Sequence, residues 1–138
     1  LAAGFENPVC EGFLCAAGTQ EMSVSDLARR VKAAVGSGYV CTYGERAVKN
    51  IVVCAGSANG EMARVRALRA DALVCGELKY HEMLEYLALG IPVVTCGHRE
   101  SEAPALWQLL RYLQNDENLV QCNLRYRIAS QDYDCVPM

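Results

Sequence analysis

The sequence lacks the features that mark membrane-spanning, nucleic-acid-binding and zinc-knuckle proteins. No apolar run in the chain approaches the roughly 20 residues that a membrane span requires. The formal charge is −3, and the basic residues are scattered apart from Arg125 and Arg127, so no electrostatic footprint for nucleic acid is present. None of the eight cysteines forms a Cys-x-x-Cys pair, which argues against a zinc knuckle. We therefore expect a soluble globular protein with neither a membrane nor a nucleic acid as partner.

The cysteines are also too few for a disulfide scaffold. Eight in 138 residues is below the roughly 8 to 10% of disulfide-stapled secreted domains, and no signal peptide precedes them. A reducing, cytoplasmic compartment is therefore expected. The chain opens on Leu1 without an initiator Met, so we expect it to be processed, trimmed or part of a longer protein.

Three apolar stretches recur at an interval of 21 residues, and each runs into a cysteine, a glycine and polar side chains. They are IVVC at 51–54, DALVCG at 71–76 and PVVTCG at 92–97. Short apolar runs that end at glycine are typical of buried strands, and the segments between them have helical spacing. The pattern predicts an α/β fold with a mainly parallel sheet flanked by helices. Strict alternation over 120–128 adds an antiparallel edge strand near the C-terminus.

The rest of the chain fits a single α/β domain over residues 1–138, because no linker divides it. Its last ten residues, 129–138, are predicted to be a loose tail. Ser23 begins a capping box, and a helix should follow it as far as Gly36. The remaining elements are expected as strands at 8–16 and 39–43 and helices at 60–69, 80–89 and 101–114.

Three polar loops follow the three repeated strands, where ligands collect in parallel α/β sheets. The first, GSANGE at 56–61, is rich in small residues, so Ser57 and the following backbone N–H groups could receive a phosphate or carboxylate. It lacks the Gly-Lys-Ser/Thr of a P-loop. Because glycine and asparagine are also what a tight turn needs, a purely structural turn is the alternative.

The second loop, GELKYH at 76–81, places Glu77, Lys79 and His81 within six residues. Alternation along an extended loop would direct all three side chains to one side, as an acid, a cation and a base. Glu77, Lys79 and the neighbouring Tyr80 are therefore candidate substrate or anion contacts, and His81 is the candidate catalytic base. Alternatively, Glu77 and Lys79 form a solvated ion pair and His81 lies in a helical first turn.

The third loop, GHRESE at 97–102, holds the candidate metal ligands His98 and Glu102. An imidazole and a carboxylate four residues apart at a strand end suit Zn, Mn, Fe or Ni. A catalytic zinc normally has three protein ligands, so Glu100, Glu77 or another segment would complete the shell. In the alternative, Ser101 caps the helix and His98 is a surface residue. A catalytic Cys96 is disfavoured, because all three repeated cysteines occupy equivalent strand positions.

Taken together and in this order, the three loops resemble the carboxyl-terminal part of the Nif-three-like family, also called GTP cyclohydrolase one type two homologues. The resemblance is carried by CAGSANGE, ADALVCGELKYHEMLEYLALGI and VVTCGHRESEAPALWQLL. That family has a Gly-rich turn, a Gly-Asp/Glu-x-x-Tyr-His stretch and a Gly-His-x-x-x-Glu motif at similar spacing. The opening helix and strand of this chain also look like those of the family.

The resemblance implies an α/β protein that assembles into a homo-oligomeric ring around a site with two divalent metal ions. It makes His98 and Glu102 metal ligands and places Tyr80 and His81 near the site. The remaining ligands of the family, a His-His pair and an Asp, belong to an amino-terminal half, and no His-His occurs here. The chain therefore resembles the C-terminal half of a longer protein.

Two functions of different kinds are consistent with this resemblance. The first is a dinuclear metal-dependent hydrolase, in which metals ~3.5 to 4 Å apart activate a bridging water and His81 carries the proton. The second is a non-catalytic metal-binding or protein-interaction module with a regulatory role, for which a protein partner is expected. The sequence leaves both open.

Overall fold

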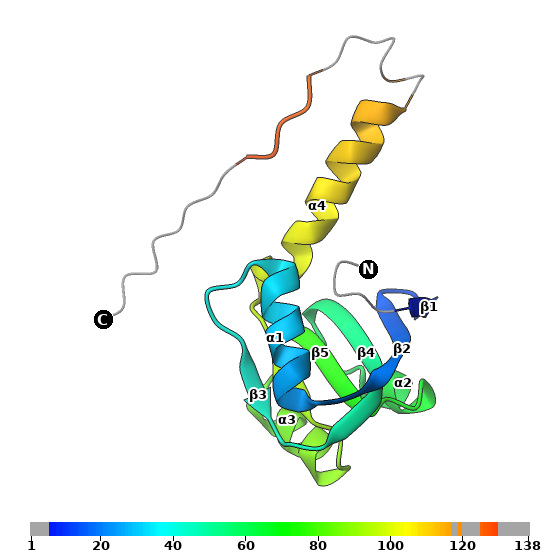
Figure 1. The fold of residues 1–138 in the computed structure, drawn as a ribbon, viewed down its shortest axis with the longest axis vertical. Helices are drawn as coiled ribbons and strands as arrows, with labels where there is room; N and C mark the ends of the chain where they lie inside the picture. Colours follow the sequence, from blue (N-terminus) through cyan, green and yellow to red (C-terminus); the bar gives the residue numbers. More distant parts are fainter. Residues whose placement is uncertain (1–5, 117–118, 120–124, 130–138) are drawn as a thin grey trace, which may run out of the picture. The chain divides into compact units, whose positions relative to one another are not determined.

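The computed structural model describes residues 6–116, 119 and 125–129 of the chain (Figure 1). Contacts divide the chain into two compact units, Leu1–Pro104 and Ala105–Met138. None of the helices in these described stretches combines the length and apolarity needed to cross a bilayer. The elements in chain order are β1 Glu6–Glu11, β2 Leu14–Ser23, α1 Val24–Val35, β3 Cys41–Tyr43, β4 Ala47–Ser57, α2 Met62–Ala67, β5 Ala72–Glu77, α3 Tyr80–Ala88, β6 Val93–Thr95 and α4 His98–Asn115.

The first unit is built on a six-stranded sheet in the order β1-β2-β4-β5-β6-β3. The predicted parallel strands form its centre, where β4 pairs with β5 and β5 with β6 in parallel. The strands outside them, β2 and β1 on one side and β3 on the other, are antiparallel. The predicted α/β class is thus confirmed, with its parallel pairing concentrated in the three repeated strands.

Local signals in the sequence account for the limits of α1. The Ser23 side chain accepts a hydrogen bond from the Asp26 backbone N–H at 3.0 Å, as the predicted capping box requires. At the other end, Gly36 adopts φ 65° and donates its N–H to the Lys32 carbonyl. The positive φ there explains why glycine ends the helix.

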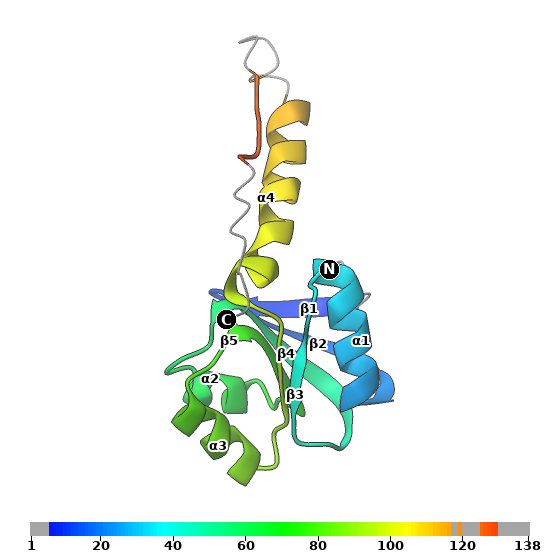
Figure 2. The same cartoon turned by 90° about the vertical axis from the view of Figure 1, so that its left-hand side faces the viewer.

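Helices cover both faces of the sheet, α1 on one side and α2 and α3 on the other (Figure 2). Alternation along β4 divides the core accordingly, because Ile51 packs with the α1 side and Val52 with the α2 and α3 side. On the α1 side, the fully buried Leu27 fills the core, and on the other side Tyr86 of α3 does so. The repeated strands are continuous apolar runs in the sequence because both of their faces are buried.

The three repeated cysteines are part of this core, but the expectation that all three occupy equivalent strand positions is wrong, because Cys75 pairs with Thr95 and Cys96 packs in the other layer. Cys54 and Cys75 lie side by side in the register of β4 and β5, and Cys96 is bonded through its backbone N–H to the Cys75 carbonyl. All three are buried. Burial raises the pKa of the Cys75 thiol to about 12 and also raises the pKa of Cys96, so neither is poised as a thiolate nucleophile.

Two sequence-based expectations are wrong at the chain's margins. Residues 8–16 form a hairpin of β1 and β2 instead of one strand, because Gly12 and Phe13 turn the chain. In the C-terminal region, residues 125–129 are not in a strand, so the edge strand predicted over 120–128 is absent from its described part. Residues 120–124, and the predicted tail from 130 onward, lie outside the described residues. The single-domain organisation stays a prediction.

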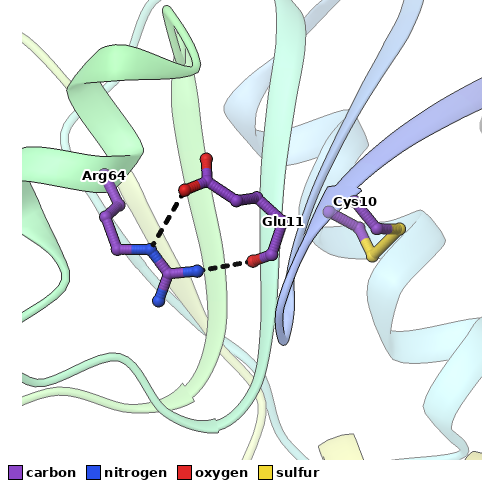
Figure 3. The surroundings of a disulfide bond; sticks show 4 residues. Cys10, Glu11 and Arg64 are labelled. Atoms are coloured by element: carbon purple, nitrogen blue, oxygen red, sulfur yellow. Dashed lines mark hydrogen bonds and ion pairs between the residues drawn. A yellow bond between two sulfur atoms is a disulfide. The ribbon is translucent and has the colours of Figure 1, made fainter.

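The hairpin also carries a disulfide between Cys10 and Cys15, which the cysteine content did not predict (Figure 3). Composition can only reveal a scaffold of many bridges. A single bridge depends on register, and Cys10 and Cys15 are direct partners across β1 and β2.

The helix α4 begins three residues earlier than expected, at His98. His98 therefore lies in its first turn, whereas Pro104 lies in the helix interior. Proline has no N–H for a hydrogen bond to the carbonyl four residues earlier, which weakens the helix at that point. The boundary between the two compact units falls directly after this residue.

The hydroxyl of Tyr86 gives a first testable prediction. Tyr86 is fully buried, and its hydroxyl has no hydrogen-bond partner among the described residues. Because an unpaired buried hydroxyl is unfavourable, Tyr86→Phe should raise the free energy of unfolding by about 1 kcal/mol. Tyr86→Ala, which empties the ring site, should lower it by about 3 to 5 kcal/mol. Urea denaturation checks both values, and a Phe variant less stable than wild type would mean that the hydroxyl is bonded.

Candidate functional site

The three polar loops meet at the carboxyl edge of β4, β5 and β6, and the Ser101 hydroxyl links two of them. It accepts a hydrogen bond from the Gly56 N–H at 2.8 Å and donates one to the His98 carbonyl at 2.7 Å. The loop after β4 is thus bonded to the first turn of α4. These two hydrogen bonds fix the position of the first loop relative to the third.

Glycines allow this close approach. A Cβ at Gly76 would lie 2.5 Å from Ser101 Oγ and 2.6 Å from the Gly56 carbonyl oxygen. A Cβ at Gly56 would lie 2.6 Å from Glu102 Oε1 and 3.1 Å from His98 Nε2, and its φ is +69°. Any side chain at position 56 would therefore fill the space beside the two predicted metal ligands.

His98 lies between two carboxylates. Its Nδ1 is 3.1 Å from Glu77 Oε1 at the end of β5, and its Nε2 is 3.2 Å from Glu102 Oε1. Glu102 reaches the ring because residues four apart share one face of a helix. About half of each side chain is exposed, with fractions of 48% for His98, 56% for Glu77 and 55% for Glu102.

The two carboxylates also determine the charge preference of the ring. The hydrogen bond with Glu77 is the largest influence and raises the pKa of His98; desolvation opposes it, and the negative charges of Glu102 and Glu77 raise the pKa further, so the net shift is upward. The site thus favours a positive charge at the imidazole. The same arrangement would attract a metal cation in place of the proton at Nε2.

Of the predicted site residues, His98 and Glu102 are brought together, and Glu77 joins them. The other members of the second loop are placed differently. Because α3 begins at Tyr80, Lys79 is its N-terminal cap residue and His81 lies in its first turn, so the expected alternation along an extended loop is wrong. Tyr80 is 71% exposed, and the exposed His81 makes no hydrogen bond or ion pair with any described residue.

Ser57 contributes to the structure of the first loop. Its hydroxyl accepts hydrogen bonds from the backbone N–H of Asn59 at 3.4 Å and from the Asn59 side-chain amide at 2.5 Å. The Asn59 Oδ1 in turn accepts from the backbone N–H of Lys79 at 2.9 Å. Asn59 therefore joins the first loop to the start of α3.

The backbone N–H groups that an anion could use are also engaged. Ala58 N–H donates to the Glu77 carbonyl, Gly60 N–H to the Glu82 carboxylate, and Glu61 N–H to the Ala58 carbonyl. The helix that follows, α2, has only six residues. The geometry favours the structural alternative for this loop, and anion binding by Ser57 stays a prediction.

The described residues offer an incomplete set of metal ligands. No three His, Cys, Asp or Glu side chains among them are grouped as a metal site would require. Because Glu77 contacts Nδ1 of the His98 ring, the donor atoms left for a metal are His98 Nε2 and the neighbouring Glu102 Oε1. Their nitrogen and oxygen chemistry suits a borderline transition metal.

Three residues of the site were not recognised as such from the sequence. From the sequence, Gly56 and Gly76 are only the first residues of two polar loops, and Ser101 is only a possible helix cap. The signal was present, because a glycine follows each of the three repeated strands. Repeated glycines at adjacent strand ends indicate that the loops beyond them pack closely.

The fold and this cluster define an α/β protein whose polar loops converge at the carboxyl edge of a parallel sheet, the usual place for a ligand in such folds. The model of the Duf34/NIF3 (NGG1p interacting factor 3) family matches residues 8–133. The chain belongs to this family, as its resemblance predicted.

Individual relatives are more distant. The chain is 24% identical over 127 residues to NGG1-interacting factor 3 of Saccharomyces cerevisiae, a match that covers 86% of this chain and 41% of that protein. It is 28% identical over 90 residues to the GTP cyclohydrolase 1 type 2 homolog of Clostridium perfringens, a match that covers 64% of this chain and 34% of that protein. The chain thus spans less than half the length of these relatives.

Solved structures agree on the fold. The Staphylococcus aureus protein SA1388 matches with a TM-score of 0.73 at 22% identity, over 91% of this chain and 41% of that one. A Bacillus cereus protein related to NIF3 matches with a TM-score of 0.68 at 22% identity, over 78% and 31%.

The space beside His98 and Glu102 can be tested with alanine at two glycines. Gly56 and Gly60 both have positive φ, but a Cβ at Gly60 would meet nothing within 4 Å. Gly60→Ala should therefore lower the free energy of unfolding by about 1 to 2 kcal/mol through backbone strain alone. Gly56→Ala should lower the free energy of unfolding by about 1 to 3 kcal/mol more than Gly60→Ala, because the added methyl group overpacks the site. Equal losses in chemical denaturation would show that the site is not tightly packed at Gly56.

Proposed function

We propose that the protein is a metal-dependent hydrolase and that this chain supplies part of its metal site, with His98 Nε2 and Glu102 as ligands. The observation that carries the proposal is the placement of His98 between Glu77 and Glu102 at the carboxyl edge of the sheet. The glycine at position 56 supports it, because it leaves both donor atoms without a covering side chain.

Glu77 has a different role in this proposal from the two ligands. A histidine that binds a metal usually donates its other ring N–H to a carboxylate or carbonyl, which fixes the tautomer and the ring orientation. The 3.1 Å contact from His98 Nδ1 to Glu77 Oε1 has this form. We assign Glu77 to the orientation of His98, in place of the substrate or anion contact first expected for it.

His81 is proposed as the proton carrier. It lies in the first turn of α3, on the loop that follows the strand bearing Glu77, and its exposed ring is free among the described residues to meet a substrate. A bound divalent metal, Zn, Mn, Fe or Ni, would supply Lewis acidity at this edge. Tyr80 and Lys79, at the start of the same helix, stay candidate substrate contacts.

A complete site needs more donors than the described residues provide. Because a catalytic zinc normally has three protein ligands, we propose that the others lie outside the described residues. Two metals per complete site, assembly into a homo-oligomeric ring and a cytoplasmic location belong to the same proposal. The first two follow from the family resemblance, and the location follows from the cysteine content.

The alternative is a non-catalytic module that binds a metal or a protein partner. The yeast relative is named for an interaction, and that property is a proposal for this chain. Metal binding without turnover of any substrate would favour this alternative.

Metal analysis of single variants tests the ligand assignment. In the full-length protein dialysed against Mn²⁺ or Zn²⁺, His98→Ala and Glu102→Gln should each weaken metal binding by about 10²-fold or more, because the first removes a donor atom and the second replaces an anionic carboxylate donor with a neutral amide. Glu85 is an exposed carboxylate on α3, so Glu85→Gln is the matched control and should bind the metal like wild type. Full metal content and affinity in both ligand variants would refute the assignment.

The role of His81 is separable from metal binding. His81→Gln should keep the wild-type metal content but lower turnover by about 10² to 10⁴-fold, the usual contribution of a general acid or base. The assay would use a panel of phosphate esters, acyl esters and GTP with the metal-loaded protein. Undiminished turnover in this variant would leave His81 without the role of proton carrier.

The orientation of His98 by Glu77 is tested by a pair of substitutions. Glu77→Ala removes the acceptor at Nδ1 and should weaken metal binding by about 10 to 100-fold. Glu77→Gln keeps an oxygen acceptor and should restore most of the affinity. If Gln weakens binding as much as Ala, the charge of Glu77 is needed and it is better described as a ligand.

A further inference from the structure

We propose that Cys10 and Cys15 form a thiol–disulfide exchange site that a protein dithiol of the Cys-x-x-Cys type can reduce, and that its redox state controls how the β1–β2 hairpin is held against α2. The proposal is independent of the metal site. It is based on the strand register, the exposure of the two cysteines and the contacts of Arg64.

The register places the two sulfur atoms together without help from the bond. Glu11 and Leu14 close the hairpin as the pair next to the turn, and Gly12 with φ 62° occupies the first turn position, where glycine is preferred. Cys10 and Cys15 form the next pair, with their Cα atoms 4.1 Å apart. At such a pair, side chains on one face are at their closest, so the bond can form again whenever β1 pairs with β2.

The pair is also accessible to a partner. Cys10 is exposed and Cys15 half-buried, and β1 lies at the end of the sheet with β2 as its neighbour. Val9 and Phe13 of the same hairpin are 65% and 54% exposed, so the hairpin itself is open to a partner.

The four other cysteines among the described residues differ from this pair in a way that selects the pair for exchange. Cys54, Cys75 and Cys96 are buried, so a protein reductant cannot approach them in the folded chain. Cys41 is exposed and free, and serves as an internal control for alkylation.

The exchange is balanced with a dithiol as the reductant. A thiolate of the partner attacks Cys10 Sγ, the Cys10–Cys15 bond breaks, and Cys15 leaves as a thiolate that takes up a proton. The second partner thiol then attacks the mixed disulfide and releases Cys10. The chain gains two electrons and two protons, and the partner becomes the oxidised disulfide.

The bond is not required for the rest of the sheet. It encloses only the four residues between Cys10 and Cys15, a loop that the turn already closes, and chain-entropy stabilisation grows with loop length. The second strand is held independently by β4, where Leu14 pairs with Cys54 and Ala17 with Ile51. Reduction should therefore free β1 while β2 and the parallel strands stay in place.

Arg64 connects the hairpin to α2 (Figure 3). Its Nη2 donates to the Glu11 carbonyl at 2.6 Å, and its guanidinium lies 5.2 Å from the centre of the Phe13 ring. Through Nη1 it also binds Glu61, at 2.9 Å, directly before α2. If β1 loosened, Arg64 would lose its contacts with Glu11. Because Arg64 also binds Glu61, the change would be transmitted to the end of the first polar loop.

The test combines native reduction with hydrogen exchange in the full chain. Purified aerobically, the protein should resist alkylation at Cys10 and Cys15 and accept it at Cys41. Treatment with thioredoxin, thioredoxin reductase and NADPH should open both cysteines while circular dichroism stays native. Amide exchange should then rise by about 10-fold or more at Val9 and Glu11 and stay unchanged in β4 and β5.

Two variants complete the experiment. Cys10→Ser should show the fast exchange in β1 without reductant, whereas Cys41→Ser should behave like wild type. Arg64→Ala should speed exchange around Glu11 and Phe13 with the disulfide intact. The proposal is overturned if both cysteines alkylate before reduction, if thioredoxin leaves the bond intact in the folded protein, if reduction leaves β1 exchange unchanged, or if it unfolds the whole sheet.

Discussion

Contact between the three loops at the carboxyl edge of the sheet is the constraint on which the site depends. Gly76 lies against both Ser101 and the Gly56 carbonyl, so the third loop can rest on the second and hydrogen-bond the first. This packing directs the first turn of α4 over the end of β5. As a consequence, His98 in the first turn of α4 contacts Glu77 at the end of β5, although the two residues are 21 positions apart in the sequence.

The apolar core below makes this edge rigid. Cys54 and Cys75 occupy equivalent positions on neighbouring strands and point to the same layer as Tyr86. Burial also suppresses thiolate formation, so the cysteines are inert there, in contrast to the pair on the hairpin.

The sequence was sufficient for features that depend on local pattern. The strand, cysteine and glycine repeat located the parallel centre of the sheet, and Ser23 and Gly36 located the ends of α1. Features that depend on strand register were missed, as with the Cys10–Cys15 pair, or left open, as with Glu77, which the sequence offers only as one possible neighbour of His98. The pairing of Cys10 with Cys15, like the approach of Glu77 to His98, requires knowledge of which strands are neighbours and in what alignment. Alternation was overinterpreted at 76–81, where the start of α3 changes the direction of the side chains.

The exposure of the cluster bears on what kind of site it is. Ligands of a closed structural metal site are surrounded by their own chain, whereas an open catalytic site leaves a position for another group. His98 and Glu102 are each about half exposed, and the space at Gly56 lies beside their donor atoms. In the proposed metal site, two half-exposed donors would hold a metal weakly by themselves, because most of its shell would still be water. The arrangement is therefore better suited to share a metal with further ligands than to bind one by itself, and the strength of binding should depend on what faces this edge.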